Sequence, residues 1–382
     1  EVNMKGHIRN IYPGGNTPEG FYSYYNYILP QRKAEKIFCL KGGPGVGKST
    51  FMKEIGKYFS EKGEDVDLLW CSSDADSLDG VVLKSRRAAL VDGTKPHIVD
   101  PVNPAAVDKI VDLGRCWDEE GIRQHRKEII ELGEKISAAF NITYGYLKIA
   151  GAEQSFMAEI LDNVITDEQL YDVRRQLDMK LGSITALKRA ESKMMRENAM
   201  GMAPKPGKFV KFFAGALTPD GMKNGLESLT ENLERLVIIN VPDGFRSENI
   251  LDAAAKRIAD AGFDGELYYC PMRPVDKLEH IIVPEGRFGI VSFNSYHRLE
   301  SVLMNKRVMF IDVALEYKED DEYREIIKAL DESSRENIDK AIGFLKKAKR
   351  YHDALEDFYI ANMDFEAVTE IRRQIISEIE RI

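Results

Sequence analysis

Residues 42 to 49, GGPGVGKS, place glycines, a lysine and a hydroxyl group at a fixed spacing: Gly42, four residues, then Gly47, Lys48 and Ser49. Glycines allow the backbone to turn with positive φ and to bring its N–H groups close to an anion. A lysine ammonium neutralises phosphate charge, and a serine hydroxyl is a ligand for Mg²⁺. These residue types together predict a loop that binds a phosphate chain.

The segments on both sides of this loop have the patterns of the elements that would position it. Residues 35–42, EKIFCLKG, form an apolar run typical of a buried strand, and residues 48–60, KSTFMKEIGKYFS, have helical spacing. A strand, a glycine-rich turn and a helix follow one another in a P-loop, where the helix N-terminus faces the same anion. We expect nine residues to bind ATP: Gly42, Gly43, Pro44, Gly45, Val46, Gly47, Lys48, Ser49 and Thr50. ATP is favoured over GTP because residues 305–308, NKRV, lack the aspartate of the guanine-binding Asn-Lys-x-Asp pattern.

Three acidic residues follow two further expected strands. Asp74 and Asp76 come after DVDLLWC (65–71), and Asp92 ends RAALVD (87–92). Ligands bind at the carboxyl ends of the strands in open α/β sheets. We expect Ser49 and Asp92 to hold Mg²⁺, and Lys48, Asp74 and Asp76 to act in catalysis, with the acids orienting the phosphate acceptor. For each acid, a solvated residue that caps a turn is the alternative.

The chain also contains an internal repeat with an offset of 198 to 201 residues. The matching blocks are residues 11–20 with 212–221, 41–50 with 239–248, Cys71 with Cys270, 86–97 with 286–297, and 170–177 with 368–375. Their conserved order predicts a tandem duplication, joined within residues 198–208. We expect two domains, 1–200 and 201–382. Each is expected to be an α/β core with a parallel sheet and a long helical arm or lid that starts near residue 117 or 319.

The second repeat has lost the residues that the phosphate chemistry needs. In chain order, the residues at the positions of Gly42, Gly45, Gly47, Lys48, Asp74 and Asp92 are Asn240, Asp243, Phe245, Arg246, Arg273 and Ser292. An acid and a phenyl ring in such a loop would repel and obstruct a phosphate. We therefore expect a degenerate second site. Arg246 and Arg273 are candidates for an arginine finger toward the first site, and pairing with local acids is the alternative.

Other recurring features are interpreted as structural. The hydroxyls of Thr17 and Thr218, each followed by Pro and an acid, are expected to cap helices. The aromatic run 21–29 is expected to be a packed helix face, with adenine stacking as the alternative. Features retained in both repeats complete the set: Asp112 and Asp312, His97 and His297 as hydrogen-bonded structural histidines, and the arginine pairs 174–175 and 372–373 as surface ion pairs or, alternatively, arginine fingers.

Composition limits the classes of protein to consider. The 382 residues are 43% hydrophobic and 31% charged, and 54 Lys and Arg against 63 Asp and Glu give a net charge of −9. This balance argues against a general nucleic-acid binder. The four cysteines have no metal-ligand spacing and are expected to be buried free thiols. With no 18-residue apolar run and no apolar stretch near residue 1, we expect a cytoplasmic protein without membrane insertion.

The loop at 42–50, with TPEG at 17–20 and VDGTKPHIVDP at 91–101, resembles the P-loop NTPase superfamily. The arrangement as a whole is similar to a bacterial family of duplicated P-loop proteins. This resemblance implies ATP binding and leaves the substrate open. We expect an enzyme with Mg²⁺-dependent phosphoryl chemistry, either an ATPase or a small-molecule or nucleotide kinase. The alternative is a nucleotide-dependent switch or scaffold that acts through its helical arms with slow turnover.

Overall fold

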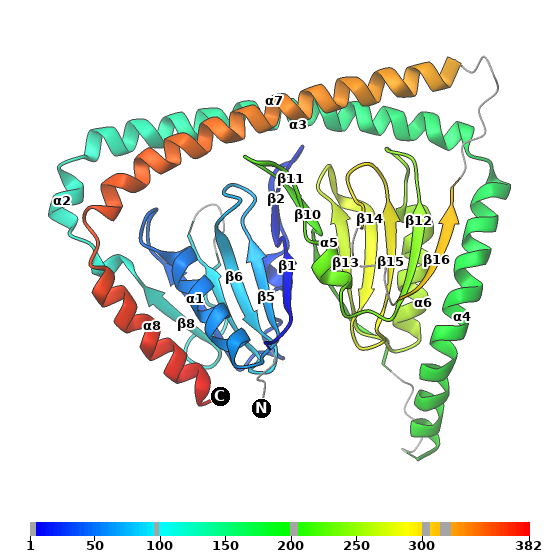
Figure 1. The fold of residues 1–382 in the computed structure, drawn as a ribbon, viewed down its shortest axis with the longest axis horizontal. Helices are drawn as coiled ribbons and strands as arrows, with labels where there is room; N and C mark the ends of the chain where they lie inside the picture. The colour runs from blue at the N-terminus through cyan, green and yellow to red at the C-terminus, as the bar shows by residue number, and fades with distance from the viewer. Residues whose placement is uncertain (1–4, 95–98, 199–204, 300–305, 314–321) are drawn as a thin grey trace. The chain divides into compact units, whose positions relative to one another are not determined.

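The computed structural model describes residues 5–94, 99–198, 205–299, 306–313 and 322–382. Within them the chain is an α/β protein with two six-stranded sheets and long helices (Figure 1). His97, expected to be a structural histidine, lies outside the described residues, and so does most of the expected join at 198–208.

The first sheet has the order β1-β5-β6-β7-β4-β8. Its strands are β1 (Ile8–Ile11), β4 (Lys36–Lys41), β5 (Val66–Trp70), β6 (Leu78–Leu83), β7 (Ala88–Asp92) and β8 (Asp108–Asp112). All three strands expected from the sequence are present, as β4, β5 and β7. In the order of the sheet, β4 lies between β7 and β8 and is parallel to both.

The second sheet repeats this arrangement with the order β9-β13-β14-β15-β12-β16. Its strands are β9 (Phe209–Phe212), β12 (Arg235–Asn240), β13 (Gly265–Cys270), β14 (Arg273–Val283), β15 (Phe288–Phe293) and β16 (Arg307–Asp312). Cys270 ends β13, and Cys71 directly follows the equivalent strand β5. The two similar sheets agree with the expected duplication.

The expectation of purely parallel sheets is wrong. In each sheet the third strand, β6 or β14, runs antiparallel to both of its neighbours. The connections explain this, because only residues 84–87 join β6 to β7 and only 284–287 join β14 to β15. A parallel connection needs a crossover of a dozen or more residues, whereas a short turn joins antiparallel strands. Both sheets are therefore mixed.

The helices fall into short ones beside the sheets and long ones that form the arms. They are α1 (Lys48–Glu61), α2 (Glu119–Arg123), α3 (Arg126–Val164), α4 (Asp167–Asn198), α5 (Leu226–Thr230), α6 (Glu248–Asp260), α7 (Glu322–Ile360) and α8 (Phe365–Glu380), with 3₁₀ turns at Tyr25–Tyr27 and Gly114–Cys116. The helix expected at 48–60 is α1, and the expected arms are α3 and α4, then α7 and α8.

The two Thr-Pro-acid-Gly segments are turns and not helix caps, which corrects the sequence interpretation. Each joins a two-stranded hairpin, β2 (Gly14–Thr17) to β3 (Gly20–Ser23) and β10 (Gly215–Thr218) to β11 (Gly221–Asn224). The Thr17 hydroxyl accepts from the Glu19 amide at 3.1 Å and donates to the Gly20 carbonyl at 2.7 Å, and φ of Gly20 is 97°. A threonine hydroxyl can satisfy a turn as well as a helix end. The aromatic run at 21–29 is accordingly in β3 and a 3₁₀ turn, not on a helix face.

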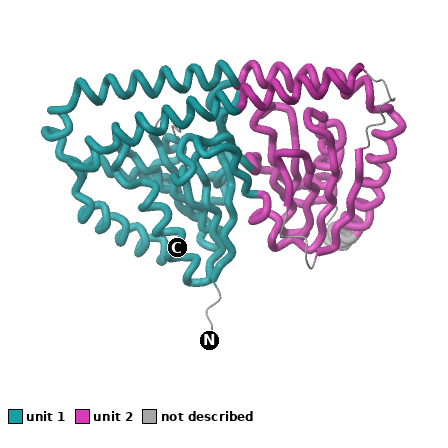
Figure 2. The backbone as a smooth tube through the Cα atoms, turned by 45° about the horizontal axis from the view of Figure 1, so that its top comes forward, with its two compact units in different colours: residues 1–146, 215–225, 339–382 teal, residues 147–214, 226–338 magenta. Residues whose placement is uncertain are grey.

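The compact units of the chain do not follow the expected boundary near residue 200. Unit 1 comprises residues 1–146, 215–225 and 339–382, and unit 2 comprises 147–214 and 226–338 (Figure 2). The second half of α7 and all of α8 thus pack with the first sheet, although they follow the second sheet in the chain. In the same way the second part of α3 and all of α4 belong with the second sheet, where α4 packs against α6. The two repeats exchange their helical arms.

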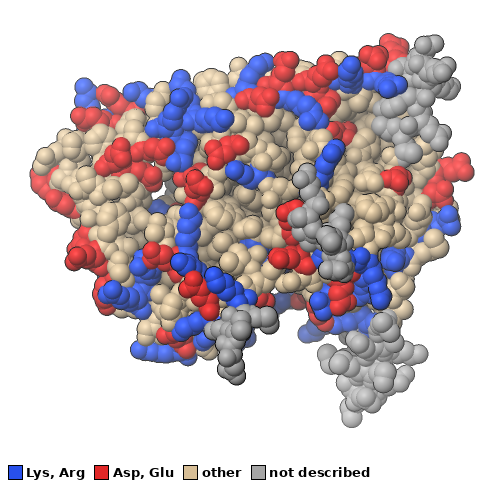
Figure 3. All heavy atoms as spheres, in the orientation of Figure 1, with Lys and Arg blue, Asp and Glu red and all other residues tan. Residues whose placement is uncertain are grey.

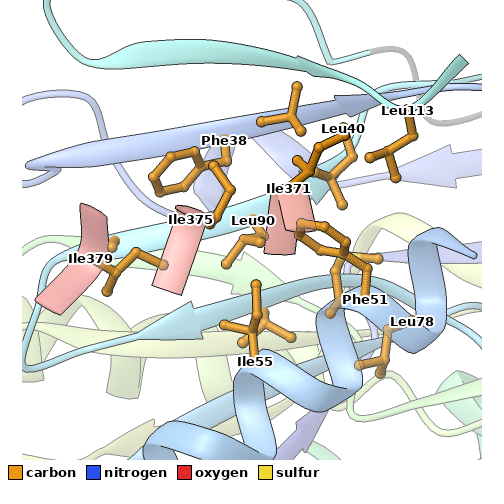
Figure 4. Close-up of a cluster of buried hydrophobic side chains, with 14 of the residues drawn as sticks. Phe38, Leu40, Phe51, Ile55, Leu78, Leu90, Leu113, Ile371, Ile375 and Ile379 are labelled. Atoms are coloured by element: carbon orange, nitrogen blue, oxygen red, sulfur yellow. The ribbon is translucent and has the colours of Figure 1, made fainter. Parts of the chain in front are cut away.

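The core of unit 1 shows how completely its exchanged arm is integrated. Ile371, Ile375 and Ile379 of α8 point into a cluster with Phe38 of β4 and Phe51 of α1 (Figure 4). All three isoleucines are at most 7% exposed. Burying a side chain of this size contributes about 1.5–3 kcal/mol. Helix α8 is therefore part of the hydrophobic core that holds the loop at 42–47 in place.

Candidate functional site

The loop between β4 and α1 has the backbone expected of an anion-binding turn. The φ angles of Gly45 and Gly47 are 68° and 83°, values that side-chain-bearing residues rarely adopt. Gly47 is the N-cap residue of α1, so the first N–H groups of that helix open onto the loop. Val46 is buried in the core beneath it, and Thr50 is exposed. The local sequence thus determines both the turn and the start of the helix.

Lys48 lies inside the loop rather than in solvent. Its Nζ donates to the carbonyl oxygens of Gly42 at 2.8 Å and Gly43 at 2.9 Å. The same ammonium is 3.6 Å from Oδ2 of Asp92, whose side chain is 13% exposed. Asp92 is the last residue of β7 and pairs in register with Leu40 on β4, which explains how it reaches the loop. Two backbone carbonyls and one carboxylate thus hold the lysine within the loop.

The expected Mg²⁺ ligands are Ser49 and Asp92. Ser49 follows Lys48 in the chain, and the Asp92 carboxylate lies beside the Lys48 ammonium in space. The Ser49 Oγ accepts from the Leu78 amide at 3.1 Å, at the start of β6. Asp92 Oδ1 accepts from the Thr94 amide at 2.9 Å and from its hydroxyl, so its second oxygen, Oδ2, faces Lys48. A hydroxyl and a carboxylate oxygen beside the loop are ligands of the kind Mg²⁺ takes.

Asp74 and Asp76 lie in the connection between β5 and β6. Asp74 Oδ2 accepts from the Ser77 hydroxyl at 2.9 Å and is 3.4 Å from Nζ of Lys349 on α7. Burial lowers the pKa of Lys349, but the hydrogen bond to Asp353 and the charge of Asp74 raise it by more. The pKa is therefore raised overall, and this ammonium stays charged. Asp76 is exposed, and its carbonyl accepts from Lys53. Asp74 thus forms an ion pair with helix α7 of the exchanged arm.

The arm also contacts the glycine loop directly, which no sequence pattern predicted. The Gly45 amide donates to Oε1 of Glu356 on α7 at 3.0 Å. A Cβ on Gly45 would lie 2.9 Å from the Glu356 carbonyl oxygen, and one on Gly43 would lie 3.2 Å from the rings of Trp117 and Tyr359. Glu356 is 311 residues from Gly45 in the chain. In the sequence, the one feature that points to Glu356 is its position on the helical arm of the second repeat.

The corresponding segment of the second repeat is filled by side chains. Phe245 is 3% exposed, and Met157 of α3 packs against Gly244, where a Cβ would lie 2.8 Å from its terminal carbon. Arg246 pairs with Asp162 at 2.8 Å, a contact inside unit 2. Arg273 pairs with two acids of the same unit, Glu248 at 2.8 Å and Asp276 at 2.6 Å. Both arginines therefore pair with acids of their own unit, which was the alternative to an arginine finger.

The remaining sequence candidates have structural partners. The Asp112 carboxylate accepts from the Gly114 amide at 2.9 Å, and the Asp312 carboxylate accepts from the Asn240 amide group at 2.6 Å. Arg175 pairs with Asp172 at 3.2 Å along α4, and Arg372 pairs with Glu54. All four cysteines are free and buried, as expected.

Charges of both signs are mixed over the face of the described residues drawn in Figure 3, where Lys and Arg side chains are interspersed with Asp and Glu. A nucleic-acid-binding face would gather basic residues into a patch or stripe. This face therefore adds nothing in favour of a nucleic-acid partner.

Among the described residues, no helix is both long enough and apolar enough to cross a membrane. Comparisons with protein-family models, with curated proteins and with solved structures found no match to this chain.

Proposed function

We propose that unit 1 binds the phosphate chain of ATP with Mg²⁺ at residues 42–50. The observation that carries the proposal is the hydrogen bond from the Gly45 amide to the carboxylate of Glu356. A backbone N–H of the loop already binds an anionic oxygen, which is the interaction a phosphate would make. The N-terminus of α1 adds a positive end to the same place.

The side chains around the loop then have distinct roles. Lys48 exchanges its contacts with the Gly42 and Gly43 carbonyls for the β- and γ-phosphate oxygens, where it stabilises developing charge. Ser49 and Asp92 hold Mg²⁺, Ser49 by its hydroxyl and Asp92 through a water molecule. Binding also requires Glu356 to leave the Gly45 amide, because two anions cannot share one donor in a small loop.

The reaction we infer is Mg²⁺-dependent hydrolysis of ATP or transfer of its γ-phosphoryl group to a small molecule or nucleotide. In-line transfer needs an oriented acceptor. We assign this role to Asp74, in the β5–β6 connection, with Asp76 beside it. The ion pair of Asp74 with Lys349 connects that acid to the arm, so acceptor positioning and arm position would change together.

A nucleotide-dependent switch is the second candidate, and the contact between Glu356 and Gly45 is the observation that favours it. ATP and the α7 carboxylate compete for one loop amide, so nucleotide binding would release part of the arm. In that case turnover would be slow and the moved arm would be the output. Phosphate release with and without a panel of hydroxyl acceptors separates an enzyme from a switch.

ATP binding itself is tested by thermal unfolding of the full chain with Mg²⁺ and ATP. A ligand at 100 times its Kd stabilises by about 2.7 kcal/mol, or roughly 5–10 °C in Tm for a unit of this size. Lys48→Ala should remove most of that shift. The matched control is Lys57→Ala, an exposed lysine on the same helix, which should retain it. An equal shift in Lys48→Ala and the wild type would refute the assignment.

A further inference from the structure

A group of three potential metal ligands is buried in unit 2, away from the loop described above in sequence and in unit. Glu279 and His280 are neighbours on β14, and His297 follows β15. They are 2%, 1% and 3% exposed. One ligand atom from each residue lies within 4.8 Å of those of the other two. Two imidazoles and a carboxylate are a ligand set that binds divalent transition metals in proteins.

Four polar atoms of this group have no hydrogen-bond partner among the described residues. Unpartnered atoms are Oε2 of Glu279, Nε2 of His280 and both ring nitrogens of His297. Oε2 of Glu279 is 3.4 Å from Nδ1 of His297. Buried polar groups are normally paired, and each unpaired one costs free energy. The sequence expectation of a hydrogen-bonded structural histidine at 297 therefore fails, because its ring lacks the bonds.

Partners for the outer atoms of the ligands are also present. Lys277 Nζ is 3.2 Å from Oε1 of Glu279, which leaves Oε2 directed to the histidines. His280 Nδ1 accepts a long 3.3 Å bond from the Ser292 amide, and the Ser292 hydroxyl is itself buried without a partner. Coordination through Nε2 would place the proton of His280 on Nδ1, and the long bond from the Ser292 amide would then be given up.

The first repeat has different residues at the positions of Glu279 and His280. Gly80 pairs with Val91 where His280 pairs with Val291, so a glycine stands in the place of His280. Asp79, at the position of Glu279, accepts from the Tyr25 hydroxyl at 2.7 Å. The acid of the first repeat thus has a phenol partner. In the second repeat Lys277 pairs with Oε1 of Glu279, and the two imidazoles lie beside the carboxylate.

We propose that Glu279, His280 and His297 bind one divalent transition-metal ion, with Zn²⁺ as the best fit to two imidazoles and one carboxylate. The ion joins β14 to the segment after β15 and stabilises unit 2. Because all three ligands are at most 3% exposed, we assign the ion a structural role. The proposal is independent of nucleotide binding in unit 1.

The test uses the full chain after removal of metals with a chelator, then Zn²⁺ or Co²⁺ alone as probes. We expect one ion per chain, a rise in Tm of about 5–10 °C at 100 times the Kd, and visible Co²⁺ absorption bands. His280→Ala and His297→Ala should each weaken binding at least about 100-fold. The control is His352→Ala, which disrupts the partly exposed group of His352, Asp353 and Glu356 in unit 1 and should leave binding unchanged.

A further variant keeps the test decisive if the histidine substitutions impair folding. Lys277→Met removes the ammonium beside Glu279, so a dication meets less repulsion. We expect tighter Zn²⁺ binding and a larger Zn²⁺-induced rise in Tm than in the wild type. The proposal is overturned by no bound ion in the wild type, by weaker binding in Lys277→Met, or by binding that is lost in His352→Ala alone. Those results would leave a buried ion pair with neutral histidines.

Discussion

Replacing Glu356 should strengthen ATP binding to unit 1. The Glu356 carboxylate accepts from the Gly45 amide at 3.0 Å, and a phosphate oxygen would need the same donor. In the free protein the carboxylate therefore competes with the nucleotide as an internal anion. Glu356→Ala removes the competitor, whereas Glu356→Gln removes its charge and keeps a weaker acceptor. We expect both variants to bind ATP more tightly than the wild type, Ala more than Gln.

The size of the effect follows from the one bond that is removed. A hydrogen bond to a charged group contributes about 1.5–3 kcal/mol. The Glu356 side chain is 29% exposed, so solvent screening favours the lower end of this range. About 1.4 kcal/mol corresponds to a tenfold change in Kd. We expect an approximately tenfold lower Kd for ATP in Glu356→Ala and a smaller decrease in Glu356→Gln.

The assay is isothermal titration of the full chain with a non-hydrolysable ATP analogue and Mg²⁺. Asp357→Asn is the matched control, because it removes the same charge from the next residue of α7, which is exposed. Its Kd should equal that of the wild type. Unchanged or weaker binding in both Glu356 variants, with binding still abolished in Lys48→Ala, would refute the competition and leave ATP binding intact. Loss of binding in every variant, including the wild type, would refute ATP binding itself.

Two stability predictions follow from the exchanged arm and from a buried ion pair. Residues 1–200 alone should not fold cooperatively, because they lack four buried α8 side chains that together contribute about 6–12 kcal/mol, as much as a typical domain's whole stability. In the full chain Ile375→Ala should cost about 2–5 kcal/mol in urea unfolding; a folded fragment or a neutral substitution would contradict this. Asp67 is buried against Arg9 at 2.7 Å, and although burial raises the pKa of Asp67, Arg9 and Lys84 lower it overall. Its contribution is therefore complete above the unfolded pKa of about 3.9 and is lost as pH falls through the lower folded value, so Asp67→Asn should be less stable at pH 7 and show a flatter loss of stability below pH 4.

Local patterns in the sequence predicted the elements around the loop correctly. The apolar run before Gly42 is β4, the helical spacing after Gly47 is α1, and the ends of both agree within two residues. The repeat also predicted two similar sheets before any strand order was known. These features depend on neighbours in the chain or on a copy of the same sequence, so they can be recognised from the sequence alone. The Thr-Pro-acid-Gly turns were missed because a threonine hydroxyl serves a turn and a helix cap equally well.

The direction of the third strand in each sheet was predictable only from the lengths of its connections. Four residues between β6 and β7 exclude a crossover helix, but that length became clear only once Leu78–Leu83 was known to be a strand. The sequence showed no separate signal for β6, because its burial on both faces gives no alternation of polar and apolar residues.

The glycine loop and its lysine were determined by the sequence itself, since positive φ angles and a helix start are local properties. What covers the loop was decided by tertiary structure alone. Glu356 reaches Gly45, and Ile375 reaches the core of the first sheet, because the two repeats exchange helices. The sequence of these helices does not indicate which sheet they pack against. An amphipathic helix specifies that one face must be buried, but not against which of two similar sheets. That choice depends on packing between residues more than 300 positions apart.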